Sequence, residues 1–237
     1  MASRVANIEI VQTKRVLNGL QPLLHGWLKV VHDFCAADQF EDNPWWYNER
    51  ASLSTLAGAA WRLPRWNALE EFSTTKRGVL PDGDVDRREN VRGRCDLYVA
   101  HATTSFAIEA KQAWQPIGSR ARKNYLAPAM QAAKRDAGNL TSDQADHRLA
   151  VVFVAPHIPL AAVSQEGKRG KRIVDAGMAK EAFAGWLGRL DTGALDAHAV
   201  HFSGRCHDFV SEHDRVFPGV LMAVKRCKRG ARGRRNS

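Results

Sequence analysis

An uninterrupted apolar run between residues 149 and 155 is the sequence feature that most constrains the fold. The run reads Leu-Ala-Val-Val-Phe-Val-Ala, and Pro156 ends it. Because successive side chains of a strand point to opposite faces of a sheet, such a run has no polar face to turn toward water. It therefore predicts a strand that is buried on both faces.

Helical and strand-like segments alternate along the rest of the chain. We expect helices at 3–38 (with a break near 19–22), 48–62, 120–138 and 175–190, and strands at 68–75, 94–101, 104–112, 149–155, 198–202 and 219–224. Asn48 is a favourable N-cap for the second helix, whose apolar residues recur every three or four positions. The order of elements predicts an α/β fold with a central mixed β-sheet flanked by helices.

The positive charge of the chain is concentrated at its end. The formal net charge is +10, and seven basic residues and no acidic residue fall within residues 225–237. We divide the chain into an N-terminal helical segment at 1–44 that packs on the core, a domain at 45–224, and a flexible basic tail at 225–237. An excess of positive charge predicts a polyanionic partner, either nucleic acid or an anionic membrane.

The four cysteines form no paired metal-binding motif, which excludes a zinc ribbon. We see no secretory signal core, and the longest apolar run is too short to cross a membrane. We therefore expect a cytoplasmic protein of bacterial or phage type that does not bind membranes, and a homodimer is compatible with the sequence.

Two adjacent predicted strands carry acidic residues on one face. A two-residue loop at 102–103 makes paired residue numbers sum to 205, which places Asp96 opposite Glu109. Lys111 lies two residues after Glu109 and so shares its face. Opposed carboxylates repel each other unless they are solvated, protonated or bridged by a cation, and Mg²⁺ binds such oxygen ligands. The geometry proposes a metal site with a lysine beside it, and the alternative is an exposed, salt-bridged sheet face.

Glu49 adds a third carboxylate, on the apolar face of the helix at 48–62. One interpretation is a favourable contact with the helix dipole, with the carboxylate reaching solvent. The other is that Glu49 faces the same site as Asp96 and Glu109. The sequence leaves both interpretations open.

The order of Glu49 on a helix, Asp96 on a strand and Glu109-Ala110-Lys111 on the next strand resembles the PD-(D/E)XK nuclease superfamily. The resemblance covers about residues 48–156 and implies a restriction-endonuclease-like core. It implies that Asp96, Glu109, Glu49 and the Ala110 carbonyl bind Mg²⁺, for which Mn²⁺ can substitute. Lys111 would position the attacking water and stabilise charge on the phosphate. The implied activity is hydrolysis of phosphodiester bonds in DNA.

The sequence departs from the family pattern at two points, which bear on the expected type of nuclease. Cys95 stands before Asp96, where proline is the family's usual residue, and the helix expected at 120–138 has no Gln-x-x-x-Tyr motif of the exonuclease branch. We therefore expect an endonuclease. The alternatives are a non-catalytic nucleic-acid-binding or regulatory protein on the same fold, and a basic protein that binds structured RNA through its tail.

Several residues are candidates for contact with the nucleic-acid backbone. They are Gln112, Arg120, Arg122, Lys123, Lys225, Arg226, Lys228 and Arg229. Phosphate contacts of this kind position a nucleic acid without reading its sequence. Trp114 follows Lys111 by three residues, and we expect its side chain to serve in packing.

Overall fold

The computed structural model describes residues 5–79, 85–119, 121–141, 143–167 and 172–227. In these ranges the helices are α1 (Gln21–Ala37), α2 (Glu49–Arg62), α3 (Leu126–Asn139) and α4 (Ala176–Leu187). The strands are β1 (Ile8–Thr13), β2 (Trp66–Val79), β3 (Val85–His101), β4 (Thr104–Pro116), β5 (His147–Pro159), β6 (Ser164–Glu166), β7 (Arg172–Val174), β8 (Ala197–Phe202), β9 (Arg215–Val216) and β10 (Gly219–Cys227).

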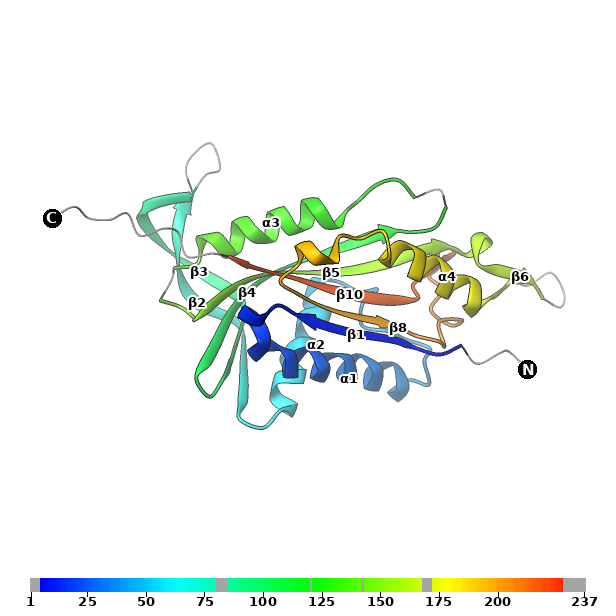
Figure 1. Ribbon diagram of the computed structural model, residues 1–237, viewed down its shortest axis with the longest axis horizontal. Helices are drawn as coiled ribbons and strands as arrows, with labels where there is room; N and C mark the ends of the chain where they lie inside the picture. The colour runs from blue at the N-terminus through cyan, green and yellow to red at the C-terminus, as the bar shows by residue number, and fades with distance from the viewer. Residues whose placement is uncertain (1–4, 80–84, 120, 142, 168–171, 228–237) are drawn as a thin grey trace.

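One mixed sheet organises the molecule. Its strand order is β1-β8-β10-β5-β4-β3-β2, with β9 paired to β5, and β6 and β7 form a separate small sheet. Helices α3 and α4 lie on one side of the main sheet, and α1 and α2 lie on the other (Figure 1). The α/β fold with a mixed central sheet flanked by helices is as the sequence predicted.

Strand β5 is the buried strand that the apolar run predicted. Its residues are buried from Arg148 through Ile158. It pairs in parallel with β4, through the crossover helix α3, and antiparallel with β10. A strand with neighbours on both edges and helices over both faces has no contact with water, which is why its sequence lacks polar alternation.

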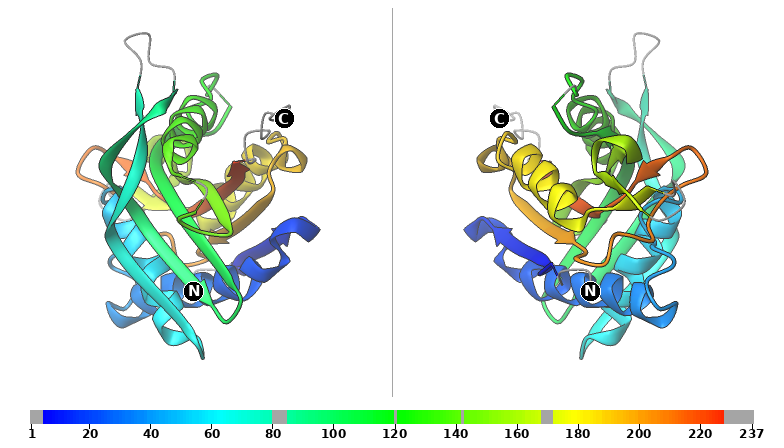
Figure 2. Two further views of the ribbon diagram at one scale, coloured as in Figure 1. Left: turned by 90° about the vertical axis from the view of Figure 1, so that its left-hand side faces the viewer. Right: turned by 90° about the vertical axis from the view of Figure 1, so that its right-hand side faces the viewer.

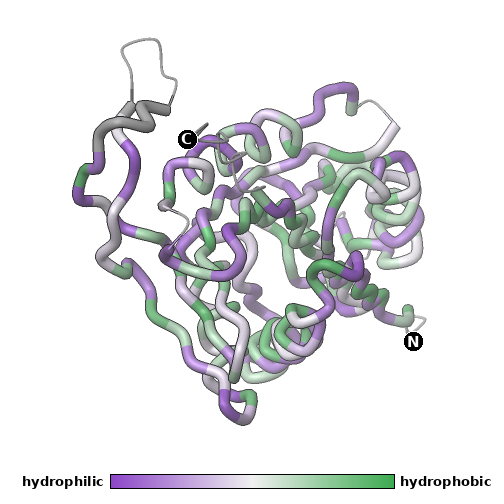
Figure 3. The backbone as a smooth tube through the Cα atoms, turned by 60° about the vertical axis from the view of Figure 1, so that its left-hand side comes forward, coloured by the Kyte–Doolittle hydropathy of each residue, from purple (hydrophilic) through white to green (hydrophobic). Residues whose placement is uncertain are grey.

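The β3–β4 hairpin has the predicted two-residue loop, and its pairs run from His101–Thr104 to Leu97–Ile108. Ala102 takes a positive φ of 46° to close the turn. The prediction that Asp96 pairs directly with Glu109 is wrong, because the ladder ends one step earlier. Beyond this point β3 stays paired with β2, and the two strands rise together away from the rest of the sheet (Figure 2). Hydrophilic residues recur along this β2–β3 arm (Figure 3).

The sequence predicted a helical N-terminal segment, but only part of this segment is helical. Residues 8–13 form β1, which pairs antiparallel with β8 at the edge of the sheet. The segment reads Ile-Glu-Ile-Val-Gln-Thr, rich in β-branched residues that fit a half-buried strand. Helix α1 follows and packs against α2 and the sheet, with Leu24, Trp27 and Val31 buried.

The C-terminal boundary also differs from the prediction. The tail was expected to start at Lys225, but β10 continues through Cys227, and Lys225 pairs with Ala150 of β5. The remaining tail residues, 228–237, lie outside the described residues. Within the described ranges, no helix combines the length and the apolar character that a membrane crossing needs.

Candidate active site

The predicted site residues meet where β3 parts from β4. The Asp96 carboxylate accepts a hydrogen bond from the backbone N–H of Ala110, at 2.8 Å. The backbone N–H of Gln112 faces Glu49 of α2, whose pKa is raised by burial although Lys111 and this amide oppose the rise. Residues two apart in a strand direct their amides to the same edge. The carboxylates of Asp96 and Glu49 therefore face backbone amides of β4 at the edge where β4 no longer pairs with β3.

Lys111 is held as a cation at this edge. Burial lowers the pKa of Lys111, but the hydrogen bond and charge of Asp136, with the charges of Glu49 and Asp96, outweigh burial and leave that pKa above its ordinary value. Its Nζ lies 2.8 Å from Asp136 Oδ2 of α3. Asp136 was missed in the sequence, because only the docking of α3 against β4 brings it to the lysine.

Glu109 is the most buried carboxylate of the group, with 2% of its surface exposed. Burial raises its pKa to about 7, and the charges of Asp96 and Asp136 add to the rise although Lys76 opposes it. Lys76 Nζ of β2 lies 2.7 Å from Glu109 Oε1. The carboxyl therefore changes between its protonated and ionised forms near neutral pH. It must be ionised to bind a metal ion.

Lys76 was also missed, since nothing in its local sequence distinguishes it from a surface lysine. The structure shows how it reaches the site. A Cβ on Gly93 of β3 would lie 2.8 Å from the Lys76 side chain, so the glycine leaves a path across the arm toward Glu109. Gly93 is thus a packing requirement of this ion pair.

Glu49 lies half-buried in the first turn of α2, a position that fits both interpretations of this residue. Asn48 caps the helix, with its Oδ1 accepting from the Ala51 N–H at 3.0 Å. Burial raises the pKa of Glu49, Lys111 lowers it and Asp96 raises it, so the carboxyl interacts electrostatically with both of these residues.

The chemistry of this cluster fits a hard divalent cation. Four carboxylates, from Glu49, Asp96, Glu109 and Asp136, face only two lysines, Lys76 and Lys111. Burial is the main cause of the raised pKa of Glu109, and repulsion from Asp96 and Asp136 adds to it. Among the described residues, no three His, Cys, Asp or Glu side chains converge closely enough to hold a metal ion. To bind an ion, Glu109 would have to leave its ion pair with Lys76.

Two glutamines of β4 have structural roles beside the cluster. Gln112, predicted to contact nucleic acid, uses its Nε2 to donate to the carbonyls of Trp45 (3.1 Å) and Tyr47 (3.2 Å). Gln115 is buried; its Nε2 donates to the Lys123 carbonyl at 2.7 Å, and its Oε1 accepts from the Tyr125 N–H at 2.8 Å. Each glutamine fixes a loop against the strand.

The basic candidates have different outcomes. Arg122 and Lys123 are exposed in the loop before α3. Lys225 is engaged within the fold, because its Nζ donates to the Ala194 carbonyl at 2.6 Å and pairs with Asp196 at 3.4 Å. The backbone N–H of Arg226 also donates to Asp196, at 2.9 Å. Arg120, Lys228 and Arg229 lie outside the described residues.

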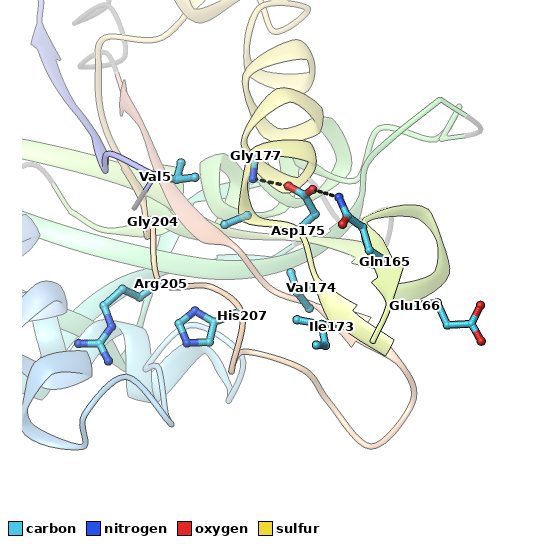
Figure 4. Close-up of a pocket in the computed structure, with 11 residues that line it drawn as sticks. Val5, Gln165, Glu166, Ile173, Val174, Asp175, Gly177, Gly204, Arg205 and His207 are labelled. Carbon is cyan, nitrogen blue, oxygen red and sulfur yellow. Dashed lines mark hydrogen bonds between the residues drawn. The ribbon is translucent and has the colours of Figure 1, made fainter. Parts of the chain in front are cut away.

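A separate hollow of about 680 Å³ lies at the other end of the sheet, between β6–β7, the start of α4 and the turn at 204–207 (Figure 4). There Asp175 Oδ1 accepts from the Gly177 N–H at 2.9 Å, and Gln165 donates to the same carboxylate. Asp175 thus serves as the cap of α4. None of the clustered carboxylates lines this hollow, so it is distinct from the candidate active site.

Comparisons of the chain with protein-family models, with curated proteins and with solved structures found no match. What the protein does is therefore inferred from the site itself.

Proposed function

We propose that the protein is a divalent-metal-dependent nuclease that hydrolyses phosphodiester bonds in DNA. The observation that carries the proposal is the gathering of Asp96, Glu49 and Lys111 along the β4 edge beside the buried Glu109. These are the residues that the resemblance to PD-(D/E)XK nucleases singles out, and they come from α2, β3 and β4.

The topology around the site supports the same proposal. Helix α2 is followed by the antiparallel strands β2, β3 and β4, then by α3 and by β5 parallel to β4. This order resembles that of a restriction-endonuclease-like core. The strands β10, β8 and β1 extend the sheet beyond it.

In the proposed enzyme, Asp96, Glu109 and Glu49, with the Ala110 carbonyl, would hold Mg²⁺ or Mn²⁺. When bound, the ion supplies a lowered water pKa and offsets charge on the phosphate. Lys111 carries a fixed positive charge, which Asp136 orients, and it stabilises the negative charge that develops on the phosphate oxygens. Lys76 holds the Glu109 carboxyl through their ion pair, and Glu109 would have to leave this pair to serve as a metal ligand.

A second candidate function is nucleic-acid binding without hydrolysis on the same fold. The ion pairs Lys76–Glu109 and Lys111–Asp136 favour it, since they already neutralise part of the cluster without a metal. Binding of a metal ion separates the two functions.

Calorimetric titration with Mn²⁺ tests the proposal. We expect one saturable site in the wild type, and at least about tenfold weaker binding in Asp96→Asn and Glu109→Gln, because each loses an anionic oxygen ligand. Because the ion displaces the Glu109 proton, binding should strengthen as the pH rises through 7.

The matched control for this titration is Glu212→Gln, which removes one carboxylate from an exposed position away from the cluster. It should bind Mn²⁺ like the wild type. If the wild type shows no saturable binding, or if all four proteins bind alike, the metal-dependent proposal fails and the binding-protein alternative gains.

A further inference from the structure

The β2–β3 arm has two faces of different character. From Phe72–Cys95 to Arg77–Asn90 its two strands pair without a register shift. Neighbours in a strand point to opposite faces, and residues that pair directly share a face. Alternate pairs therefore lie on the same side of the arm. One side faces the rest of the protein, because Phe72 and Cys95 pack there with Leu140.

The other side of the arm, which we call the arginine face, is polar throughout. It consists of three alternate pairs, namely Ser73–Arg94, Thr75–Arg92 and Arg77–Asn90. Five of these six side chains are exposed, and that of Arg77 is half-buried. None of the six is acidic or aromatic. The face therefore presents three positive charges with hydroxyl and amide groups between them.

The arginine face begins beside the candidate active site. Arg94 Nη1 lies 3.1 Å from Glu71 Oε2, and Arg50 Nη2 of α2 lies 2.7 Å from Glu71 Oε1. The shared carboxylate ties Arg94 to the start of α2, where Arg50 directly follows Glu49, and Arg94 precedes Asp96 by two residues. Two arginines share one carboxylate, so a net positive charge remains, and both arginine side chains are largely exposed.

The groups on this face suit the phosphates of nucleic acid. A guanidinium offers paired N–H donors to phosphate oxygens, and serine and threonine hydroxyls add single donors. Unpaired bases are bound by stacking on aromatic side chains, which the six residues of the face lack. Trp114 is 50% exposed, so the prediction that it serves in packing is wrong, but it lies on β4 and not on the arm. The chemistry favours the backbone of a duplex over unpaired bases.

We propose that the arginine face of the β2–β3 arm binds the phosphate backbone of duplex DNA and leads it to the candidate active site. Contacts of this kind position a duplex without reading its sequence. Binding does not depend on hydrolysis; the consequence that the arm positions the strand to be cut rests on the proposed nuclease function.

Fluorescence anisotropy in EDTA, with a labelled DNA duplex at a series of salt concentrations, measures binding apart from cleavage. The test variant is Arg92→Gln/Arg94→Gln. We expect it to bind at least about tenfold more weakly at low salt. The slope of log K against log salt concentration should be less steep by about 2, one for each lost phosphate contact. Glu71 keeps its ion pair with Arg50, so the variant leaves no unpaired carboxylate there.

Arg15→Gln/Arg189→Gln is the matched control, because it removes the same charge from two other exposed arginines. Arg15 follows β1, at the opposite edge of the sheet from β2, and Arg189 follows α4. This control should bind the duplex like the wild type. Arg92→Lys/Arg94→Lys keeps both charges and should recover most of the salt dependence, and this recovery excludes a general folding defect.

Three results would overturn the inference: no duplex binding by the wild type at low salt, equal affinity and salt dependence in the two double glutamine variants, or tighter binding of oligo(dT) than of a duplex of equal length. Duplex binding that depends on the arm, without cleavage in Mg²⁺, would retain this inference and reject the nuclease. Duplex cleavage in Mg²⁺, with duplex affinity unchanged in Arg92→Gln/Arg94→Gln, would do the reverse.

Discussion

Replacement of Asp96 by asparagine, or of Lys111 by alanine, is expected to reduce Mg²⁺-dependent DNA cleavage by about 100- to 1000-fold. The first change removes an anionic ligand, and the second removes the cation that stabilises charge on the phosphate. An asparagine oxygen can still accept the Ala110 N–H, so the hairpin should keep its shape. The half-buried Asp136 left by the second change can be solvated.

Cleavage of supercoiled plasmid and of linear duplex and single-stranded DNA measures this effect. Lys29→Ala is the control, since it removes the same charge as Lys111→Ala from an exposed position on α1. It should cleave like the wild type. Equal activity in the wild type, Asp96→Asn and Lys111→Ala would refute the catalytic assignment.

Glu109→Gln is expected to change the pH dependence of stability. The folded protein holds the Glu109 proton up to a pKa of about 7, whereas the unfolded chain loses it near the ordinary value of 4.5. The folded state thus binds more protons between these values, and the stability of the wild type falls as the pH rises through this window. Glutamine cannot ionise, and its oxygen can still accept from Lys76. Relative to the wild type, the variant should therefore gain up to about 3 kcal/mol in unfolding free energy between pH 4 and pH 8.

Urea unfolding at a series of pH values measures this gain. Glu212→Gln should show a pH profile parallel to that of the wild type, because its carboxylate is exposed. Parallel profiles for Glu109→Gln as well would mean that Glu109 ionises as a surface carboxylate does. In a separate measurement, Mg²⁺ should stabilise the wild type above pH 7 more than it stabilises Glu109→Gln.

Local patterns predicted the features that depend on neighbours in sequence. The apolar run of β5, the two-residue turn at 102–103 and the Asn48 cap each follow from a few adjacent residues. The site residues of β4 could also be predicted from the sequence, because alternation in a strand puts Glu109 and Lys111 on one face. Strand β1 was missed because its short alternating segment was read as part of the helix that follows.

The rest of the site depends on tertiary structure. Asp136 reaches Lys111 only through the docking of α3, and Lys76 reaches Glu109 only because Gly93 leaves room for its side chain. The exposure of Trp114 depends on where β3 leaves β4, which hydrophobicity does not encode. Pairing partners and the point of divergence of two strands are set by the whole sheet.

A crystal structure of the protein grown with Mn²⁺, with the ion located by its anomalous scattering, tests the central claim most directly. We expect one ion coordinated by the Asp96 and Glu109 carboxylates, with Glu49 adjacent and Lys76 displaced from Glu109. An ion bound elsewhere, or no ion and an intact Lys76–Glu109 pair, would contradict the assignment of these carboxylates as a catalytic metal centre.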